Sequence, residues 1–161
     1  MSIANSLVEN AWYAAGLSGD FAPGKVHGRV IASKPMVLWR NRDDRISVFD
    51  DRCIHKRMPL SAGRIMDDGC LECVYHGLRY DADGICVAIP SQPDGPIPAR
   101  ARLRPYPLCE QQGLVWVWPG DEGRIGNCRP PATPEIDDAD WDTCPSDRLP
   151  VSANYRLLIE N

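Results

Sequence analysis

Two cysteines and two histidines lie in two short, polar segments of the chain, at spacings typical of metal ligands. One residue separates Cys53 from His55 in DDRCIHKRMPLSAG, and two residues separate Cys73 from His76 in CVYHGL. The whole sequence has three histidines, so two of them belong to these segments. Thiolate and imidazole groups are common protein ligands of zinc and iron. We therefore predict that these four residues bind a metal centre.

Two kinds of metal centre use two Cys and two His. Structural zinc takes four such ligands in a tetrahedron, whereas a [2Fe–2S] cluster of the Rieske kind has two Cys on one iron and two His on the other. Zinc fingers usually pair Cys with Cys and His with His, but here each segment supplies one of each. Two facing loops can then each place a sulfur on an inner iron and an imidazole on an outer iron. The pattern favours the cluster and leaves zinc as the alternative.

The other cysteines and the third histidine are less suggestive of chemistry. Cys70 forms a C-x-x-C motif with Cys73 and offers a rival ligand set, but we interpret it as a small residue at the start of a strand. His27, beside Gly28, is expected in a solvated turn. The remaining cysteines are predicted to pack as small apolar residues: Cys86, Cys109, Cys128 and Cys144.

Short β-like runs broken by turn residues must position the ligand segments. Val and Ile are frequent in these runs, and Asp83-Gly84 in YDADGICVAIP is a strong hairpin signal. NRDD, at residues 41–44, is a plausible hairpin loop between two of the runs. We therefore predict a mainly β fold of short antiparallel strands. The expected strands include residues 28–33, 36–40, 45–50 and 114–118.

Composition limits the class of protein. The 161 residues suit about one domain, and an apolar fraction of 43% is enough for a core. The longest apolar runs span about five residues, whereas a membrane span needs roughly 18. The N-terminus has no secretory pattern, and the net charge of −4 argues against nucleic acid as the main partner. A cytoplasmic protein without membrane or nucleic-acid partners is expected.

The character of the chain changes after Trp118. Eight acidic residues and two arginines lie between Asp121 and Asp147, and five prolines lie between Pro119 and Pro145. We interpret residues 121–150 as an extended acidic, proline-rich connector. The predicted division is a domain at 1–120, with metal-binding loops at about 53–63 and 70–78, then the connector, then the start of another domain at 151–161. In that last segment Tyr155, Leu158 and Ile159 share a spacing that suits a core.

The ligand segments resemble the cluster-binding half of a Rieske non-heme iron oxygenase α subunit, of the aromatic-ring-hydroxylating, vanillate O-demethylase and dicamba monooxygenase type. NAWY at residues 10–13 is similar to that branch, and the resemblance covers about residues 11–161. Three residues differ from the usual ones and bear on the tuning of the cluster: Ile54, Lys56 and Leu78. Beyond the four ligands and the YDADG hairpin, the resemblance rests on Leu60, Ser61, Gly63, Tyr75 and Gly77.

The resemblance implies two iron centres in a full-length protein. A Rieske [2Fe–2S] cluster is held by Cys53, His55, Cys73 and His76, and a mononuclear Fe(II) lies in a following α+β catalytic domain. Asn161 is placed near that second iron, whose His and carboxylate ligands are not expected in residues 1–161. A reductase or ferredoxin is expected to reduce the cluster. His76 would then pass the electron to the mononuclear iron of a neighbouring subunit in a homotrimer or α3β3 assembly.

The implied reaction is hydroxylation or O-demethylation of an aromatic acid with O2. The alternative is a stand-alone Rieske-type ferredoxin, which carries electrons only and does not need the connector. Respiratory Rieske proteins carry an additional Cys in each loop, and these form a disulfide. Met58 and Tyr75 stand at those positions here, so a potential near the low end of roughly −150 to +300 mV is expected. Lys56, Arg57 and Arg64 give the loops a basic rim, which serves either solubility or the docking of an acidic electron donor.

Overall fold

The structure, a computed structural model, describes residues 7–144, 149–154 and 157–158. The predicted mainly β fold is confirmed, because short antiparallel strands dominate the described residues. The strands are β1 (Tyr13–Leu17), β2 (Val26–Ile31), β3 (Lys34–Arg40), β4 (Ile46–Asp50), β5 (Arg64–Ile65), β6 (Leu71–Glu72), β7 (Arg79–Tyr80), β8 (Cys86–Ala88), β9 (Leu108–Gln111) and β10 (Leu114–Val117). The 3₁₀ helices are η1 (Ser18–Asp20), η2 (Leu60–Ala62), η3 (Glu122–Arg124) and η4 (Pro134–Ile136).

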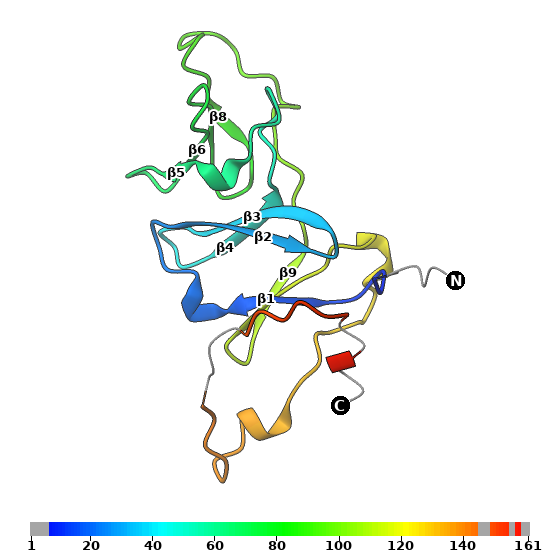
Figure 1. Ribbon diagram of the computed structural model, residues 1–161. Coiled ribbons are helices and arrows are strands. Elements are labelled where there is room, and N and C mark those ends of the chain that lie inside the picture. Colours follow the sequence, from blue (N-terminus) through cyan, green and yellow to red (C-terminus); the bar gives the residue numbers. More distant parts are fainter. Residues whose placement is uncertain (1–6, 145–148, 155–156, 159–161) are drawn as a thin grey trace, which may run out of the picture.

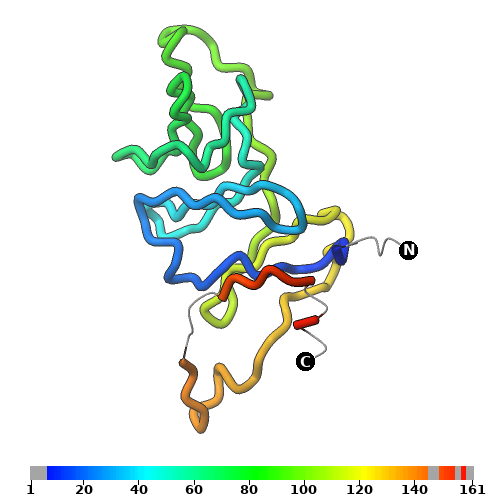
Figure 2. The backbone as a smooth tube through the Cα atoms, viewed as in Figure 1, coloured from blue at the N-terminus to red at the C-terminus, as the bar shows by residue number. Residues whose placement is uncertain are grey.

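The strands form three antiparallel sheets. Two three-stranded sheets, with orders β1-β10-β9 and β2-β3-β4, make the base of the molecule, and the four-stranded sheet β5-β6-β7-β8 stands at one end (Figure 1). The chain leaves the base after β4, builds the end sheet, and returns to the base at β9 (Figure 2). Both predicted ligand segments lie at this end of the molecule, the first before β5 and the second between β6 and β7, so the base serves as their support.

Strand β3 joins the two parts because both of its faces are buried. Successive side chains of a strand point to opposite faces. Met36 and Leu38 therefore pack into the core of the base, whereas Val37 and Trp39 pack into the core beneath the end sheet. The Trp39 ring stacks on Phe49 of β4 with centroids 5.3 Å apart. One strand thus fixes the position of the end sheet on the base.

The two hairpins that sequence predicted are present. In the first, the Asn41 N–H donates to the Arg45 carbonyl at 2.9 Å between β3 and β4. In the second, Gly84 has a positive φ of 76°, and a Cβ there would lie 2.4 Å from a ring carbon of Phe49. Only glycine fits this turn, because it must adopt a left-handed conformation against an aromatic ring.

One strand and one histidine were predicted wrongly. The strand expected at 28–33 starts at Val26 and ends at Ile31, and Ala32 and Ser33 form the turn into β3 with positive φ at both residues. Asn-Gly is the usual signal for such a turn, and Ala-Ser does not give it. His27 lies in β2 rather than in a solvated turn, half-buried, with its ring edge-on to Phe21 at 5.1 Å.

Beyond β10 the chain is held to the base by side chains. Gln112, in the β9–β10 turn, donates to the Thr133 carbonyl at 2.9 Å and accepts from the Thr133 N–H at 2.8 Å. Trp12 donates from its indole nitrogen to the Cys128 carbonyl at 3.1 Å. Of the three residues expected to face a further core, Leu158 is exposed, and Tyr155 and Ile159 lie outside the described residues.

Neither the predicted boundaries at 120 and 150 nor the role of residues 151–161 is tested by this arrangement, so they stay predictions. Asn161 also lies outside the described residues. Among the residues that are described, no helix is long and apolar enough to cross a membrane.

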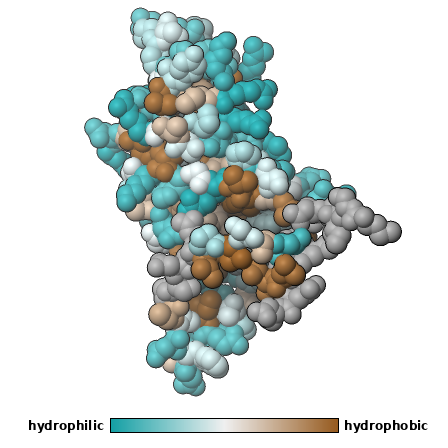
Figure 3. All heavy atoms as spheres, viewed as in Figure 1, coloured by the Kyte–Doolittle hydropathy of each residue, from teal (hydrophilic) through white to brown (hydrophobic). Residues whose placement is uncertain are grey.

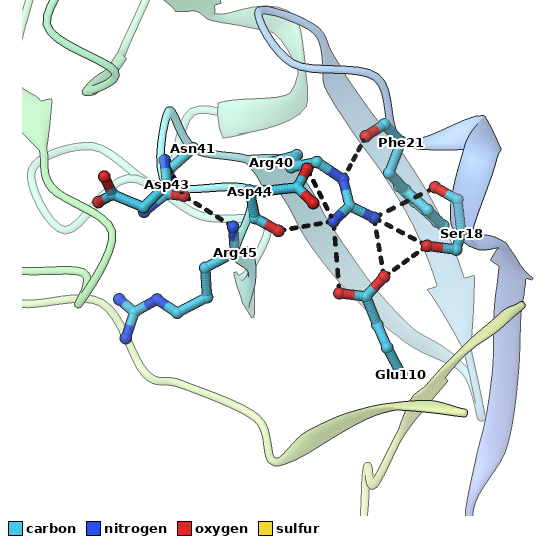
Figure 4. Close-up of polar contacts among 8 residues, drawn as sticks. All are labelled: Ser18, Phe21, Arg40, Asn41, Asp43, Asp44, Arg45 and Glu110. Atoms are coloured by element: carbon cyan, nitrogen blue, oxygen red, sulfur yellow. Dashed lines mark hydrogen bonds and ion pairs between the residues drawn. The ribbon is translucent and has the colours of Figure 1, made fainter. Parts of the chain in front are cut away.

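A buried arginine ties the two base sheets together (Figure 4). Arg40 of β3 donates to the Phe21 carbonyl at 2.9 Å and to Glu110 of β9 at 2.8 Å. It also donates to the Ser18 hydroxyl at 2.9 Å and to the Asp44 carbonyl at 2.6 Å. Burial opposes the charge on Glu110, but hydrogen bonds from Arg40 and Ser18 outweigh it, so the pKa of Glu110 lies below its ordinary value. The pair is thus a charged cross-link between sheets.

Replacement of this carboxylate should give a pH-dependent loss of stability. Because the folded pKa of Glu110 is lowered, its stabilising effect is present above the unfolded value of about 4.3 and is lost as pH falls through the folded value. Glu110→Gln should therefore lower the free energy of unfolding by about 1 kcal/mol at neutral pH. Urea unfolding should show that this difference shrinks towards zero below about pH 4. A loss of unfolding free energy that is equally large at neutral pH and below about pH 4 would contradict the charged pair of Arg40 and Glu110.

Candidate metal centre

The first ligand segment is a tight loop closed by two backbone hydrogen bonds. The Cys53 N–H donates to the Met58 carbonyl at 2.9 Å, and the Arg57 N–H donates to the Cys53 carbonyl at 2.9 Å. Arg57 has a positive φ of 58°, an uncommon conformation for a residue with a side chain. The loop turns the chain back so that His55 lies at its tip.

The second ligand segment repeats the same loop. The Cys73 N–H donates to the Leu78 carbonyl at 2.9 Å, and the Gly77 N–H donates to the Cys73 carbonyl at 3.0 Å. Gly77 has a positive φ of 71°, and a Cβ there would lie 3.0 Å from Pro90. In both loops the cysteine is the first residue, and the residue four positions later has a left-handed backbone conformation. The two loops are thus structural equivalents, although the histidine is the third residue in one and the fourth in the other.

A glycine and a serine fix the chain that leaves the first loop, the glycine against β6 and the serine against Asp51, which follows β4. A Cβ at Gly63 would lie 2.2 Å from the Glu72 carbonyl oxygen, so only glycine lets the chain leaving this loop approach β6 so closely. The Ser61 N–H and hydroxyl both donate to the Asp51 carboxylate, at 2.7 and 2.6 Å. Gly63 and Ser61 thus have structural roles beside the predicted ligands.

The two cysteines are buried at the inner side of the loops. Cys53 is 2% exposed and Cys73 is 1% exposed, and their thiols interact with each other. The fully buried Tyr80 places its hydroxyl 3.2 Å from the Cys53 sulfur. Sequence reasoning missed Tyr80, because its contact depends on how β7 packs beneath the first loop.

The two histidines lie on the outer side. Both are exposed, and their ring centroids are 4.6 Å apart. The ring of Tyr75 packs against His76 with a centroid distance of 3.8 Å. Each loop therefore offers a buried sulfur and a solvent-facing imidazole, and the structure brings all four predicted ligands to one end of the molecule.

This donor set fits a Rieske cluster. Burial raises the pKa of the Cys73 thiol, with its neighbour Cys53 adding to the shift, and positively charged iron would favour the thiolates that binding needs. Two sulfurs on the inner side and two imidazoles on the outer side match the two unlike irons of such a cluster. In the described part of the chain, no three His, Cys, Asp or Glu side chains are grouped as a site for one metal ion.

A hollow of about 720 Å³ opens beside the histidines. Both imidazoles form part of its wall, together with side chains from residues 89–101. Most of the lining is apolar, with Arg100 among its polar members. The outer side of the site is therefore accessible to molecules larger than water.

The remaining cysteines follow the predictions in part. Cys70 is half-buried just before β6, as expected, and Cys86 is 2% exposed in the core beneath the loops. The packing interpretation was wrong for Cys128 and Cys144, which are exposed. All seven cysteines lie within the described residues and none forms a disulfide.

Comparison with known proteins identifies the family. The family model described as the Rieske [2Fe-2S] domain matches residues 11–107. The chain therefore belongs to the Rieske [2Fe–2S] domain family, and the predicted cofactor, a Rieske cluster, is confirmed at the level of the family.

Relatives of the chain include oxygenase components. The iron–sulfur subunit of the toluene-4-sulfonate monooxygenase system of Comamonas testosteroni is 33% identical over 160 residues, 96% of this chain and 43% of that protein. The oxygenase component of dicamba O-demethylase from Stenotrophomonas maltophilia is 37% identical over 159 residues, 97% of this chain and 45% of that protein. A crystal structure of dicamba monooxygenase superposes with a TM-score of 0.74 and 36% identity, over 83% of this chain and 42% of that chain. The chain thus spans less than half the length of these relatives.

The hydroxyl of Tyr80 should raise the reduction potential of the cluster. Burial, with the neighbouring Cys53, raises the pKa of Tyr80, so the phenol keeps its proton and would donate a hydrogen bond to the Cys53 sulfur if that sulfur is a ligand of the cluster. Hydrogen bonds to cluster sulfurs stabilise the more negative, reduced state. Tyr80→Phe should lower the potential, measured by an EPR-monitored redox titration, on the order of tens of millivolts.

The matched control is Tyr106→Phe, which removes another buried hydroxyl, one that contacts Asp50 rather than a predicted ligand. It should leave the potential unchanged. An unchanged potential in Tyr80→Phe would rule out the hydrogen bond as a determinant.

Proposed function

We propose that Cys53, His55, Cys73 and His76 hold a Rieske [2Fe–2S] cluster and that the chain transfers electrons within an oxygenase component. The observation that carries this proposal is the pair of equivalent loops, each with a buried thiol and an exposed imidazole. When bound, the cluster accepts and releases one electron at a time.

The residues of the chain have distinct roles in this proposal. Cys53 and Cys73 anchor the inner iron in a site from which side-chain packing excludes water. His55 and His76 hold the outer iron, and their exposed rings form the edge at which electrons enter and leave. The backbone hydrogen bonds that close the loops keep the four side chains oriented before the iron binds. Such preorganisation reduces the rearrangement that accompanies the change of charge.

The oxygenase role rests on the relatives. Their names describe a toluene-4-sulfonate monooxygenase system and a dicamba O-demethylase, and this chain matches 43% and 45% of their lengths. We propose that electrons pass from a reductase or ferredoxin to the cluster and on, past His76, to a mononuclear iron in a catalytic domain of a neighbouring subunit. There O2 would hydroxylate or demethylate an aromatic acid.

A reading frame that continues past Asn161 into an Asp and two His supports this role, whereas a stop codon there favours a stand-alone ferredoxin. The cytoplasmic location stays a prediction.

The ligand assignment predicts opposite results for two neighbouring substitutions. His76→Ala should abolish the Rieske EPR signal of the reduced protein, because the outer iron loses one of its two imidazoles. Cys70→Ala should retain the signal, because Cys70 lies outside the loop and before β6. Circular dichroism should show that both variants keep the β fold.

A signal retained in His76→Ala, or lost in Cys70→Ala with the fold intact, would overturn the assignment. A colourless wild-type protein that binds one zinc ion per chain would overturn the proposed function itself.

A further inference from the structure

The two ligand loops differ in what closes them at their ends. The second loop, at residues 73–78, lies between β6 and β7, and these strands pair with each other so that Glu72 lies opposite Arg79. The first loop, at residues 53–58, lies between β4 and β5, which belong to different sheets. Among the strands that the structure describes, pairing therefore closes the ends of the second loop but not those of the first.

The ends of the first loop are attached to two separate parts of the molecule. Before the loop, the Asp51 N–H donates to the Pro35 carbonyl at 3.1 Å, which attaches the chain to β3 of the base. After the loop the chain enters β5, where Arg64 pairs with Glu72 of β6 in the end sheet. A displacement of the end sheet on the base would therefore open the first loop and leave the second loop closed.

One carboxylate joins the two ends of the first loop. One oxygen of Asp51 accepts from the Ser61 N–H at 2.7 Å, and the other accepts from the Ser61 hydroxyl at 2.6 Å. Asp51 follows β4 and Ser61 lies in η2, so these two bonds enclose the whole loop. Hydrogen bonds to a carboxylate are among the stronger ones in proteins. We call the pair of Asp51 and Ser61 the loop clamp.

Gly28 of β2 makes room for the loop clamp. A Cβ at Gly28 would lie 2.9 Å from the Ser61 Cβ and 3.9 Å from an Asp51 carboxylate oxygen. The backbone of Gly28 is not left-handed, so its conformation does not require glycine. The close approach of β2 to Ser61 is therefore what the missing side chain permits.

Apolar packing gives the first loop little support at its tip. Residues 54–57 are all exposed. On the face seen in Figure 3, the end of the molecule that carries β5–β8 is mostly hydrophilic with small apolar areas. Because burial of apolar surface is the main stabilising force in proteins, the loop depends on the polar contacts at its ends.

We propose that Asp51 is a positioning residue that holds Cys53 and His55 in place through Ser61, and that iron leaves the site from the first loop when the loop clamp opens. This inference rests on the proposed function, because it concerns the loop proposed to hold two of the four ligands. In this step the bonds from Cys53 and His55 to iron break and water protonates the freed ligands. A chelator takes the ferric iron and the sulfides leave as hydrogen sulfide, so no electron is transferred.

The test uses the full chain loaded with its cluster. Loss of visible absorption follows the release of iron to excess EDTA, and mass spectrometry follows hydrogen exchange of the amides in each loop. Ser61→Ala removes one bond of the loop clamp and Asp51→Ala removes both, whereas the amide of Asp51→Asn can keep both. Asp68→Ala is the matched control, because Asp68 also accepts from a backbone N–H, that of Cys70, beside the second ligand segment.

Ser61→Ala should speed iron release about tenfold and Asp51→Ala about a hundredfold, since each hydrogen bond to a carboxylate favours the closed loop by about a factor of ten. In Asp51→Ala, amide exchange should accelerate similarly at residues 53–60 and stay unchanged at residues 73–78. Asp51→Asn should stay close to the wild type in both measurements. Asp68→Ala should match the wild type, because strand pairing closes the second loop.

Gly28→Ala tests the loop clamp without removing any of its hydrogen-bonding groups. The added methyl group has to displace Ser61, so iron release should again be faster than in the wild type. Gly19→Ala is the control, since a Cβ at Gly19 meets nothing within 4 Å among the described residues beyond its chain neighbours. If Asp51→Ala does not load a cluster, Gly28→Ala and Ser61→Ala decide the question.

Two results would overturn the role of Asp51. The first is iron release at the wild-type rate in both Ser61→Ala and Gly28→Ala. The second is faster exchange in both loops alike, because that would indicate a general loss of stability and not the opening of one loop. Failure of the proposed function is distinguishable, since the wild type would then lack the visible absorption of a [2Fe–2S] cluster before EDTA is added.

Discussion

The metal end of the molecule depends on a difference in burial between thiols and imidazoles that are neighbours in sequence. Cys53 and Cys73 are almost fully buried, whereas His55 and His76, two and three residues later, are exposed. Two equivalent backbone hydrogen-bonded loops create this difference. A cluster held there would have its sulfur-ligated iron in the protein and its imidazole-ligated iron at the surface. Charge can then reach the outer iron without exposing the inner one to water.

The base of the molecule keeps these loops in place. Trp39 of β3 packs beneath the end sheet, while Met36 of the same strand packs into the base. Arg40, the next residue after Trp39, links β3 to Glu110 of β9. Rigid support of this kind matters for electron transfer, because ligands that hold their positions limit the rearrangement between oxidation states.

Local sequence signals predicted the parts of the structure that depend on local chemistry. The ligand spacing, the Asp83-Gly84 turn and the mainly β fold were readable because each reflects residues close together in the chain. The Ala32-Ser33 turn was missed, because its residues are poor turn formers and pairing of β2 with β3 imposes the conformation. Tyr80 and Glu110 were missed because their partners lie 27 and 70 residues away, which no spacing reveals.

If the two loops share one binuclear cluster with unlike irons, Mössbauer spectroscopy of the reduced, ⁵⁷Fe-loaded chain will resolve both irons. We expect two iron atoms per chain, with a ferric site ligated by sulfur alone and a ferrous site that carries the nitrogen ligands and has a larger isomer shift. One metal ion per chain, or two irons with the same all-sulfur parameters, would contradict it.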